Sequence, residues 1–192
     1  FFHFKTKSRS LPDIVCDAQA ECSTPCEKAT MFNRYFGSVF NHAVTTENPR
    51  TENVDLNSVS DPFFSVDQVE DCLSKIDVKR AFAPNTIPPV ILKNCRFLLA
   101  PSLCVLFNTC IQCECIPNEW KKAYVVPIHK KGDRKEVSNY RPISLLCSVS
   151  KALERCIFNQ LYPEIENLIH PLQHGFIKGR SCTSQLLDVY HR

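Results

Sequence analysis

The sequence predicts an α+β chain that is mostly helical and has one late β-hairpin. Several segments carry apolar residues at helical spacing behind a capping or proline signal. The segment 123–146 breaks this pattern, because two short runs rich in β-branched and aromatic residues flank a polar stretch that contains Gly132. With 192 residues, of which 44% are hydrophobic, the chain can bury a core as one domain or as one domain with an appendage.

Capping boxes mark the first two predicted helices. Thr24 and Glu27 enclose a proline suited to the first helical position, and Ser65 and Gln68 repeat the capping arrangement. The polar stretch 45–62 between the two helices is typical of a loop or linker. The residues predicted to face inward are Ala29, Phe32, Phe36, Val39 and Phe40 in the first helix, and Val66, Val69, Cys72, Leu73 and Ile76 in the second.

The remaining helical segments follow similar signals. Residues 83–93 are predicted to form a turn that leads into a short helix, and Pro101 to open a longer one. Ser150 is predicted to cap the next helix, and after a turn-rich stretch, 170–182, a last helix covers 181–191. The predicted inward residues are Leu103, Leu106, Phe107, Cys110 and Ile111 after Pro101, and Leu153, Cys156, Ile157 and Leu161 after Ser150.

The predicted hairpin places a cluster of positive charge on its turn. From Trp120 to Arg141 there are seven basic residues against two acidic ones, although the whole chain has a net charge of only +3. Such a turn suits a polyphosphate or a nucleic-acid backbone, and composition alone favours plain solvent exposure equally. Arg141 follows Tyr140 in the strand, and we expect it to be partly sheltered. Pro127 and Pro142 predict edge positions or irregular strand pairing.

Twelve cysteines are many for a chain of this length. Several, such as Cys72 and Cys156, lie where a helix needs an apolar residue, and the N-terminus does not resemble a secretory signal, so we expect reduced, buried thiols. The spacing of Cys110, Cys113 and Cys115 is not that of a standard zinc knuckle, and a zinc-stabilised interaction domain is the third-ranked hypothesis. No apolar run is long enough to predict a membrane span or a membrane partner.

Several long motifs occur in an order that resembles one protein family. The stretches WKKAYVVPIHKKGDRKEVSNYRPISLLCSVSKALERCI (120–157) and QHGFIKGRSCTSQLL (173–187) resemble the fingers region of reverse transcriptases from non-LTR (LINE-type) retrotransposons, especially the jockey and CR1 group. Upstream, FNRYFGSVF (32–40) and residues 87–121 resemble the segments that precede the fingers in the same proteins. The resemblance covers nearly the whole chain and is weakest before Thr24.

The resemblance implies a partial right-hand polymerase that stops before the palm. It divides the chain into an N-terminal helical extension and linker (1–60), a helical region preceding the fingers (61–118), and incomplete fingers (119–192). The implied reaction is RNA-templated addition of deoxynucleotides to a DNA primer, so the expected partners are an RNA template, a DNA primer and a deoxynucleoside triphosphate. Apolar surface that the palm would cover is expected to be exposed, which predicts poor solubility.

The site residues implied by the resemblance are mostly phosphate ligands. Arg141 is the best match for binding the triphosphate of the incoming nucleotide, and Lys130 and Lys131 are second candidates for the triphosphate or a template phosphate. Residues 173–181 resemble the block that joins fingers to palm in the family. The matching residues, which the resemblance implies contact template or primer, are Gln173, Gly175, Phe176, Arg180 and Ser181. His174 is expected to be a turn residue.

The catalytic carboxylates of the family have no match in this sequence. Family members hold two magnesium ions on palm aspartates, one of them in an aromatic-x-Asp-Asp turn. The chain has no Asp-Asp pair, and Asp188 is expected to be a helix-surface residue. We therefore expect no catalytic residue, no metal site and no cofactor here, with Mg²⁺ required only in a full-length family member. The alternative hypothesis is a non-catalytic nucleic-acid-binding module.

One turn departs from the family pattern. The family has Gly-Pro-Asp-Gly before its Ile-Pro pair, whereas Ala83 and Thr86 stand at the two glycine positions here. Glycine permits the positive φ of a tight turn and a β-branched threonine resists it. The sequence therefore leaves the geometry of this turn open.

Overall fold

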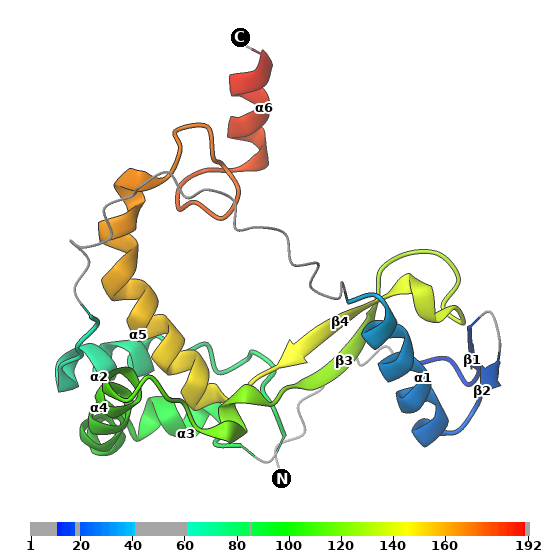
Figure 1. Cartoon of the computed structure of the whole chain (residues 1–192), viewed down its shortest axis with the longest axis horizontal. Helices are drawn as coiled ribbons and strands as arrows, with labels where there is room; N and C mark the ends of the chain where they lie inside the picture. Colours follow the sequence, from blue (N-terminus) through cyan, green and yellow to red (C-terminus); the bar gives the residue numbers. More distant parts are fainter. Residues whose placement is uncertain (1–10, 18–19, 41–60, 85, 191–192) are drawn as a thin grey trace. The chain divides into compact units, whose positions relative to one another are not determined.

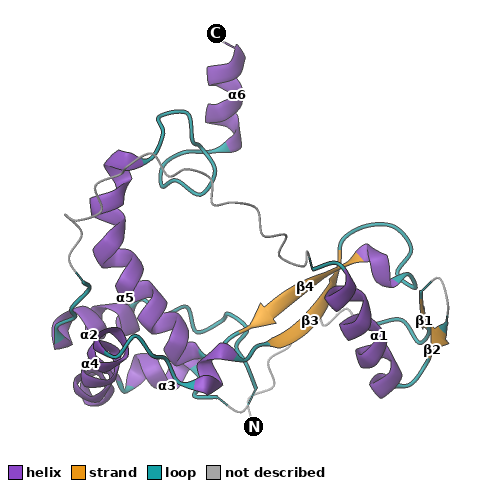
Figure 2. Ribbon diagram, in the orientation of Figure 1, coloured by secondary structure: helices purple, strands orange, loops and turns teal. Residues whose placement is uncertain are grey.

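The computed structural model describes residues 11–17, 20–40, 61–84 and 86–190 (Figure 1). Helices predominate among them, with two small antiparallel sheets (Figure 2). The helices are α1 (Pro25–Ser38), α2 (Val66–Ser74), α3 (Pro89–Asn94), α4 (Arg96–Gln112), α5 (Ser148–Ile165) and α6 (Cys182–Tyr190), with short 3-10 turns at η2 (Asn118–Lys121), η3 (Val137–Asn139) and η4 (Glu166–Leu168). The strands are β1 (Val15–Cys16), β2 (Glu21–Cys22), β3 (Tyr124–His129) and β4 (Tyr140–Leu145). This agrees with the predicted α+β class.

The chain forms two compact units, each assembled from separate stretches of sequence. Among the described residues, the ribbon unit comprises 11–17, 20–40, 81–84 and 119–147, and the helical unit comprises 61–80, 86–118 and 148–190. The three consecutive regions expected from the resemblance stay a prediction. Each unit has its own buried residues and is described separately below.

The predicted hairpin is confirmed as the antiparallel pair β3–β4 of the ribbon unit. Its register runs without interruption from Tyr124 opposite Leu145 to His129 opposite Tyr140. Pro127 lies directly opposite Pro142. Proline has no backbone N–H, so the two strands lack an amide donor at the same position of the ladder. A two-stranded sheet has only edge strands, which is where proline is tolerated. The expectation of edge positions therefore holds, and irregular pairing is not observed.

A second, shorter hairpin was not predicted. β1 pairs with β2, and Cys16 also forms an isolated bridge with Glu136. The Cys16 amide donates to the Lys135 carbonyl oxygen at 2.8 Å. Strands of two residues carry too little periodicity to be recognised in a sequence, so this pairing depends on contacts between distant segments.

α1 begins as predicted, with Thr24 and Glu27 forming a capping box. Its buried face is narrower than the predicted stripe: Phe32 and Phe36 are buried, whereas Ala29, Val39 and Phe40 are exposed. The helix ends at Ser38, so the spacing argument does not extend to Val39 and Phe40. The core of the ribbon unit consists of Val15, Met31, Phe32, Phe36, Val137 and Tyr140.

In the helical unit, α2 packs against α4 and α5. The Ser65–Gln68 capping box is present, and Val69, Cys72 and Leu73 are buried as predicted, whereas Val66 is 40% exposed. The other buried side chains come from α3 (Leu92), α4 (Ala100, Cys104, Phe107 and Cys110) and α5 (Ala152, Leu153 and Cys156). Leu106, predicted to face inward, is 38% exposed.

Two helices start earlier than predicted. α4 begins at Arg96 rather than Pro101, and the Arg96 Nε lies 3.6 Å from Glu70 Oε1 of α2. This ion pair and the burial of Ala100 extend the helix upstream of the proline. α5 begins at Ser148, so Ser150 is a buried residue inside the helix rather than its cap.

The turn at Ala83 forms without the backbone conformation that glycine favours. Among the described residues, the non-glycine positions with positive φ are Glu114 and Phe176, so neither Ala83 nor Thr86 has one. Ala83 is buried, and its amide donates to the Leu146 carbonyl oxygen at 3.2 Å. No helix in the described part of the chain is long and apolar enough to cross a membrane.

Candidate nucleic-acid interface

The tip loop, residues 130–139, carries the basic cluster and is tied down by its own hydrogen bonds. The Lys130 amide donates to the Asn139 carbonyl oxygen at 2.8 Å, which adds one more rung to the β3–β4 ladder. The Asn139 Nδ2 donates to the Asp133 carbonyl oxygen at 2.9 Å. Gly132 has φ +81, and a Cβ there would lie 2.6 Å from Asn139 Nδ2. The loop therefore closes around Asn139, and only glycine fits beside it.

The tip loop is also anchored to the core of the ribbon unit. Tyr140 is buried, packs edge-on against Phe32 at 4.9 Å between ring centroids, and donates its hydroxyl to the Arg134 carbonyl oxygen at 2.7 Å. Burial raises the pKa of Tyr140 above its usual value, so the hydroxyl stays protonated as a donor. Val137 is fully buried. The short β1–β2 hairpin and α1 thus support the loop from within the same unit.

Three cations of this region, Lys130, Lys131 and Arg141, point to solvent. None of them forms an ion pair with another described residue. Arg141 is therefore more open than expected, because its face of the two-stranded ribbon meets solvent. Its Cα partner across the ladder is Ile128.

One face of the ribbon combines apolar side chains with two of these cations. Side chains alternate along a strand, so Ile128 and Lys130 share the face of Arg141. The apolar residues of this face are Tyr124, Val126, Ile128, Ile143 and Leu145, all of them exposed or half-buried. A charged and apolar exposed face of this kind can contact both phosphate oxygens and flat organic rings.

The second group of predicted site residues lies in the helical unit, in the turn-rich loop 170–181. Arg180 donates through Nη1 to the carbonyl oxygens of Pro171 and Gln173, the latter at 2.7 Å, and Gln173 Nε2 donates to the Gly175 carbonyl oxygen at 3.1 Å. The Arg180 guanidinium therefore holds the loop together, although its side chain was predicted to contact template or primer. Ser181 caps α6, since its Oγ accepts the Ser184 amide at 3.1 Å.

Phe176 is displayed by this loop in a strained conformation. Its φ is 64 and its side chain is fully exposed. A bulky residue in the left-handed region is a genuine outlier, and such strain gathers at functional positions. An exposed aromatic ring on a braced loop is suited to stacking against a nucleobase.

His174 joins the loop to α6, which sequence reasoning missed. It is buried, with Nδ1 2.8 Å from Ser184 Oγ and Nε2 2.8 Å from Asp188 Oδ2. Ser184 and Asp188 are four residues apart and so share one helix face, which is the signal that could have paired them with a histidine in the preceding turn. Asp188 is a helix-surface residue, as expected, with its side chain 54% exposed.

The cysteines that suggested zinc belong to a helix-ending motif. The Cys115 amide donates to the Cys110 carbonyl oxygen at 3.1 Å and the Glu114 amide to the Ile111 carbonyl oxygen at 3.1 Å, with Glu114 at φ 50. These bonds form a Schellman motif at the end of α4. Within the described residues, no group of three or more His, Cys, Asp or Glu side chains is placed to hold a metal ion.

Comparison with known proteins identifies relatives of one kind. The chain is 27% identical to the probable RNA-directed DNA polymerase from transposon BS of Drosophila melanogaster, over 93% of this chain and 21% of the relative. It is 30% identical to the RNA-directed DNA polymerase from mobile element jockey of the same species, over 65% of this chain and 14% of the relative. It is 34% identical to the Pol polyprotein from type-1 retrotransposable element R2 of Popillia japonica, over 39% of this chain and 10% of the relative.

The chain thus spans about a fifth or less of each of these relatives. No protein-family model matches the sequence.

Proposed function

We propose that this chain, whose homologues are RNA-directed DNA polymerases of jockey, R2 and other non-LTR retrotransposons, is the fingers portion of such a reverse transcriptase with the segments that precede it. In this proposal the tip loop and the Arg141 face of the ribbon meet the incoming nucleotide and the RNA template. The observation that carries it is the exposure of Lys130, Lys131 and Arg141, which form no ion pair with another described residue, at a loop braced by Tyr140 and Asn139.

Arg141 is the proposed ligand of the nucleotide triphosphate. Its guanidinium can hold two phosphate oxygens at once, and without an acidic partner among the described residues it loses no ion pair when it does so. Lys130, two residues beyond Ile128 on the same face, supplies a second charge, and Lys131 lies next to it in the loop. Positive charge at this place would orient the triphosphate and offset charge on the leaving pyrophosphate.

The loop 170–181 is the proposed contact to template or primer. Phe176 would stack on a base, and Gln173, Gly175 and Ser181 would shape the backbone around it. Arg180 is already committed to two carbonyl oxygens, so its proposed role is to maintain the loop rather than to bind phosphate. This assignment rests on the exposure of Phe176 and on its strained φ.

A second candidate function is nucleic-acid binding without catalysis. The sequence contains no Asp-Asp pair with which to hold catalytic magnesium, and a full-length reverse transcriptase would supply these carboxylates and the Mg²⁺ from its palm. We therefore propose that the 192-residue chain binds nucleic acid but does not extend a primer. Primer-extension assays with RNA template, DNA primer, nucleotides and Mg²⁺ should give no product, and any extension product would contradict this.

The binding proposal is tested by the salt dependence of RNA affinity. Arg141→Ala and Lys130→Ala should each weaken RNA binding in filter assays at low and moderate salt, and each should lower the slope of log affinity against log salt by about 1. Lys79→Ala is the matched control, because Lys79 is an exposed lysine of the helical unit outside both proposed sites. Unchanged affinity and slope in both test variants would refute the phosphate assignment.

The template assignment is tested separately with Phe176→Ala. Because the Phe176 side chain is fully exposed, its loss should leave folding intact, and removal of a stacking ring should weaken binding of single-stranded RNA by about 1–3 kcal/mol, with little change in the salt slope. Phe176→Tyr should retain binding. Equal affinities for the alanine variant and the parent chain would exclude this loop from the interface.

A further inference from the structure

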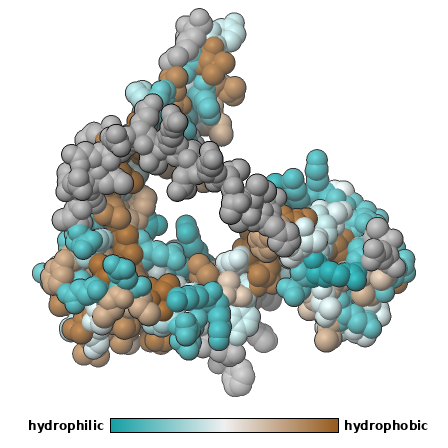
Figure 3. Space-filling model, in the orientation of Figure 1, coloured by the Kyte–Doolittle hydropathy of each residue, from teal (hydrophilic) through white to brown (hydrophobic). Residues whose placement is uncertain are grey.

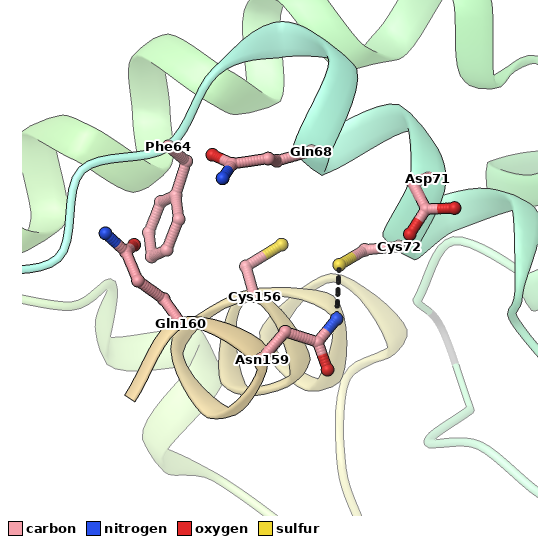
Figure 4. Close-up of a pocket in the computed structure, with 7 residues that line it drawn as sticks. All are labelled: Phe64, Gln68, Asp71, Cys72, Cys156, Asn159 and Gln160. Atoms are coloured by element: carbon pink, nitrogen blue, oxygen red, sulfur yellow. Dashed lines mark hydrogen bonds between the residues drawn. The ribbon is translucent and has the colours of Figure 1, made fainter. Parts of the chain in front are cut away.

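The helical unit contains a cavity of about 160 Å³ with two buried sulfur atoms in its wall. Cys72 of α2 and Cys156 of α5 are 5% and 3% exposed, both line the cavity, and their side chains point toward one another (Figure 4). The remaining lining residues are Phe64, Gln68, Asp71, Asn159 and Gln160. Of these, Gln68, Asp71 and Asn159 are exposed, so the cavity leads from a polar rim to the two thiols.

The two thiols lie close enough to change how each of them ionises. The neighbouring Cys156 thiol lowers the pKa of Cys72 to about 7 against the opposing effect of burial. The Asn159 Nδ2 donates to the same sulfur at 3.5 Å. The Cys72 sulfur and burial together raise the pKa of Cys156. The pair therefore loses its first proton more readily than an isolated thiol does and holds the second more tightly.

The cavity also offers a polar contact to a small molecule. Gln160 Oε1 is buried without a hydrogen-bond partner among the described residues, and Gln160 lines the same cavity. A buried acceptor without a partner is unusual and is commonly satisfied by an ordered water molecule. The cavity is several times the volume that a water molecule occupies in the liquid, which leaves space for one slightly larger molecule of this kind.

We propose that Cys72 and Cys156 are a redox modification site, at which hydrogen peroxide entering this cavity converts the dithiol to a disulfide between α2 and α5. The Cys72 thiolate attacks one peroxide oxygen, the O–O bond breaks, and hydroxide leaves, which produces a sulfenic acid on Cys72. The Cys156 sulfur then attacks the Cys72 sulfur, the S–O bond breaks, and the leaving hydroxide takes the proton of the Cys156 thiol and departs as water. The two sulfurs together lose two electrons, and the peroxide is reduced to two water molecules.

The product would connect two helices that the sequence separates widely. A cross-link between α2 and α5 removes conformational freedom from the unfolded chain. The thermal unfolding midpoint of the oxidised chain should therefore exceed that of the reduced chain, and a thiol reductant should reverse the difference. The site lies wholly within the helical unit and does not depend on the proposed nucleotide contacts of the ribbon unit.

Peptide mapping of the whole chain tests this proposal. A parent variant with Cys26, Cys113, Cys115 and Cys182 changed to serine removes the exposed thiols and leaves eight of the twelve cysteines. After treatment with hydrogen peroxide, non-reducing mass spectrometry should find the peptides of Cys72 and Cys156 linked, with two thiols lost per chain. Cys110 is the internal control, since it is buried, its pKa is raised by burial, and it should remain a free thiol.

Two further variants establish the order of the steps. In Cys156→Ser the sulfenic acid on Cys72 should persist and be captured by dimedone, whereas in Cys72→Ser the Cys156 thiol should stay unmodified. Oxidation of Cys110 at the same rate as Cys72, or linkage of Cys72 to a thiol other than Cys156, would overturn the proposal. The same mapping on the unsubstituted chain settles the matter if a variant does not fold, because absence of the Cys72–Cys156 link there would also overturn it.

Discussion

At the scale of single residues, Gly132 determines whether the tip loop can close. Its φ of +81 strains any other residue, and a Cβ would collide with the side chain of Asn139 at 2.6 Å. Gly132→Ala should therefore lower the free energy of unfolding by about 2 kcal/mol. Urea denaturation followed by fluorescence of Trp120, the single tryptophan of the chain, reports on the ribbon unit.

Gly37 provides the matched control for this substitution. It lies within α1, and a Cβ there would meet nothing within 4 Å. Gly37→Ala should raise the free energy of unfolding by up to about 1 kcal/mol, because alanine is the better helix former. If the two alanine variants had the same stability, the assigned strain at Gly132 would be wrong.

Tyr140 links the stability of the ribbon unit to alkaline pH. Its hydroxyl donates to the Arg134 carbonyl oxygen, and burial raises its pKa, so the folded state favours the protonated form. A raised pKa contributes stability that is complete below the usual tyrosine pKa of 10.0 and is lost as pH rises through the folded-state value. The free energy of unfolding should therefore fall above about pH 10.

Tyr140→Phe separates this effect from other alkaline titrations. At neutral pH the variant should be less stable by about 1 kcal/mol, because the Arg134 carbonyl oxygen loses its donor. Above pH 10 the gap between the two proteins should narrow, since only the parent has a hydroxyl to ionise. A constant gap across this range, measured by urea denaturation at several pH values, would contradict the assignment.

At the scale of elements, the C-terminal end of α4 places a glutamate, Glu114, at a backbone position that favours glycine. Glu114 occupies the left-handed position of a Schellman motif, where glycine is preferred because a Cβ is disfavoured there. Glu114→Gly should therefore raise the free energy of unfolding by about 1 kcal/mol. Thermal denaturation followed by circular dichroism measures the shift.

The control for this element is a glutamate with ordinary backbone angles. Glu119 lies in η2 and has no positive φ. Glu119→Gly should lower the stability slightly, because glycine there adds only freedom to the unfolded chain. Two glycine variants with shifts of the same sign would argue against the Schellman assignment.

At the scale of the whole molecule, both units leave apolar side chains at the surface. In the helical unit Phe97, Leu98 and Val105 of α4 are 61%, 81% and 68% exposed, and in the ribbon unit Val125 and Ile143 are 52% and 45% exposed. Apolar patches appear in brown over α4 and over the β3–β4 ribbon (Figure 3). Surfaces of this kind mark contacts with another protein or nucleic acid, or a tendency to aggregate.

Self-association of the isolated chain should follow from this surface. Light scattering should increase with protein concentration, and the cross-strand pair Val126→Thr and Ile143→Thr should reduce it, because threonine keeps the strand preference and adds a hydroxyl. Val39→Thr, at an exposed site outside strands β3 and β4, is the control. Scattering that the control reduces as much as the double variant would show that the ribbon is not the associating surface.

Local signals in the sequence were sufficient to predict which segments form helices and which form the β3–β4 hairpin. The capping boxes at Thr24 and Ser65 and the change of period at residue 123 predicted helices and the β3–β4 hairpin where they occur. Helix ends were less predictable, since the ion pair of Arg96 with Glu70 extends α4 upstream of Pro101. The same limit explains why Phe40, at helical spacing but beyond the last helical residue, was wrongly assigned to the core.

The candidate sites likewise have one part that the sequence predicts and another that only the tertiary structure determines. Charge and chemistry come from the sequence alone, which identified Arg141, Lys130 and Lys131 as a basic cluster and Cys72 and Cys156 as inward-facing thiols. Their surroundings depend on contacts between segments far apart in the chain: α1 and β1 brace the tip loop, α5 brings Cys156 to Cys72, and α6 brings Asp188 and Ser184 to His174. Hydrogen bonds and burial between distant residues leave no periodic trace in a sequence, so only tertiary packing specifies which cations stay unpaired and which thiols meet.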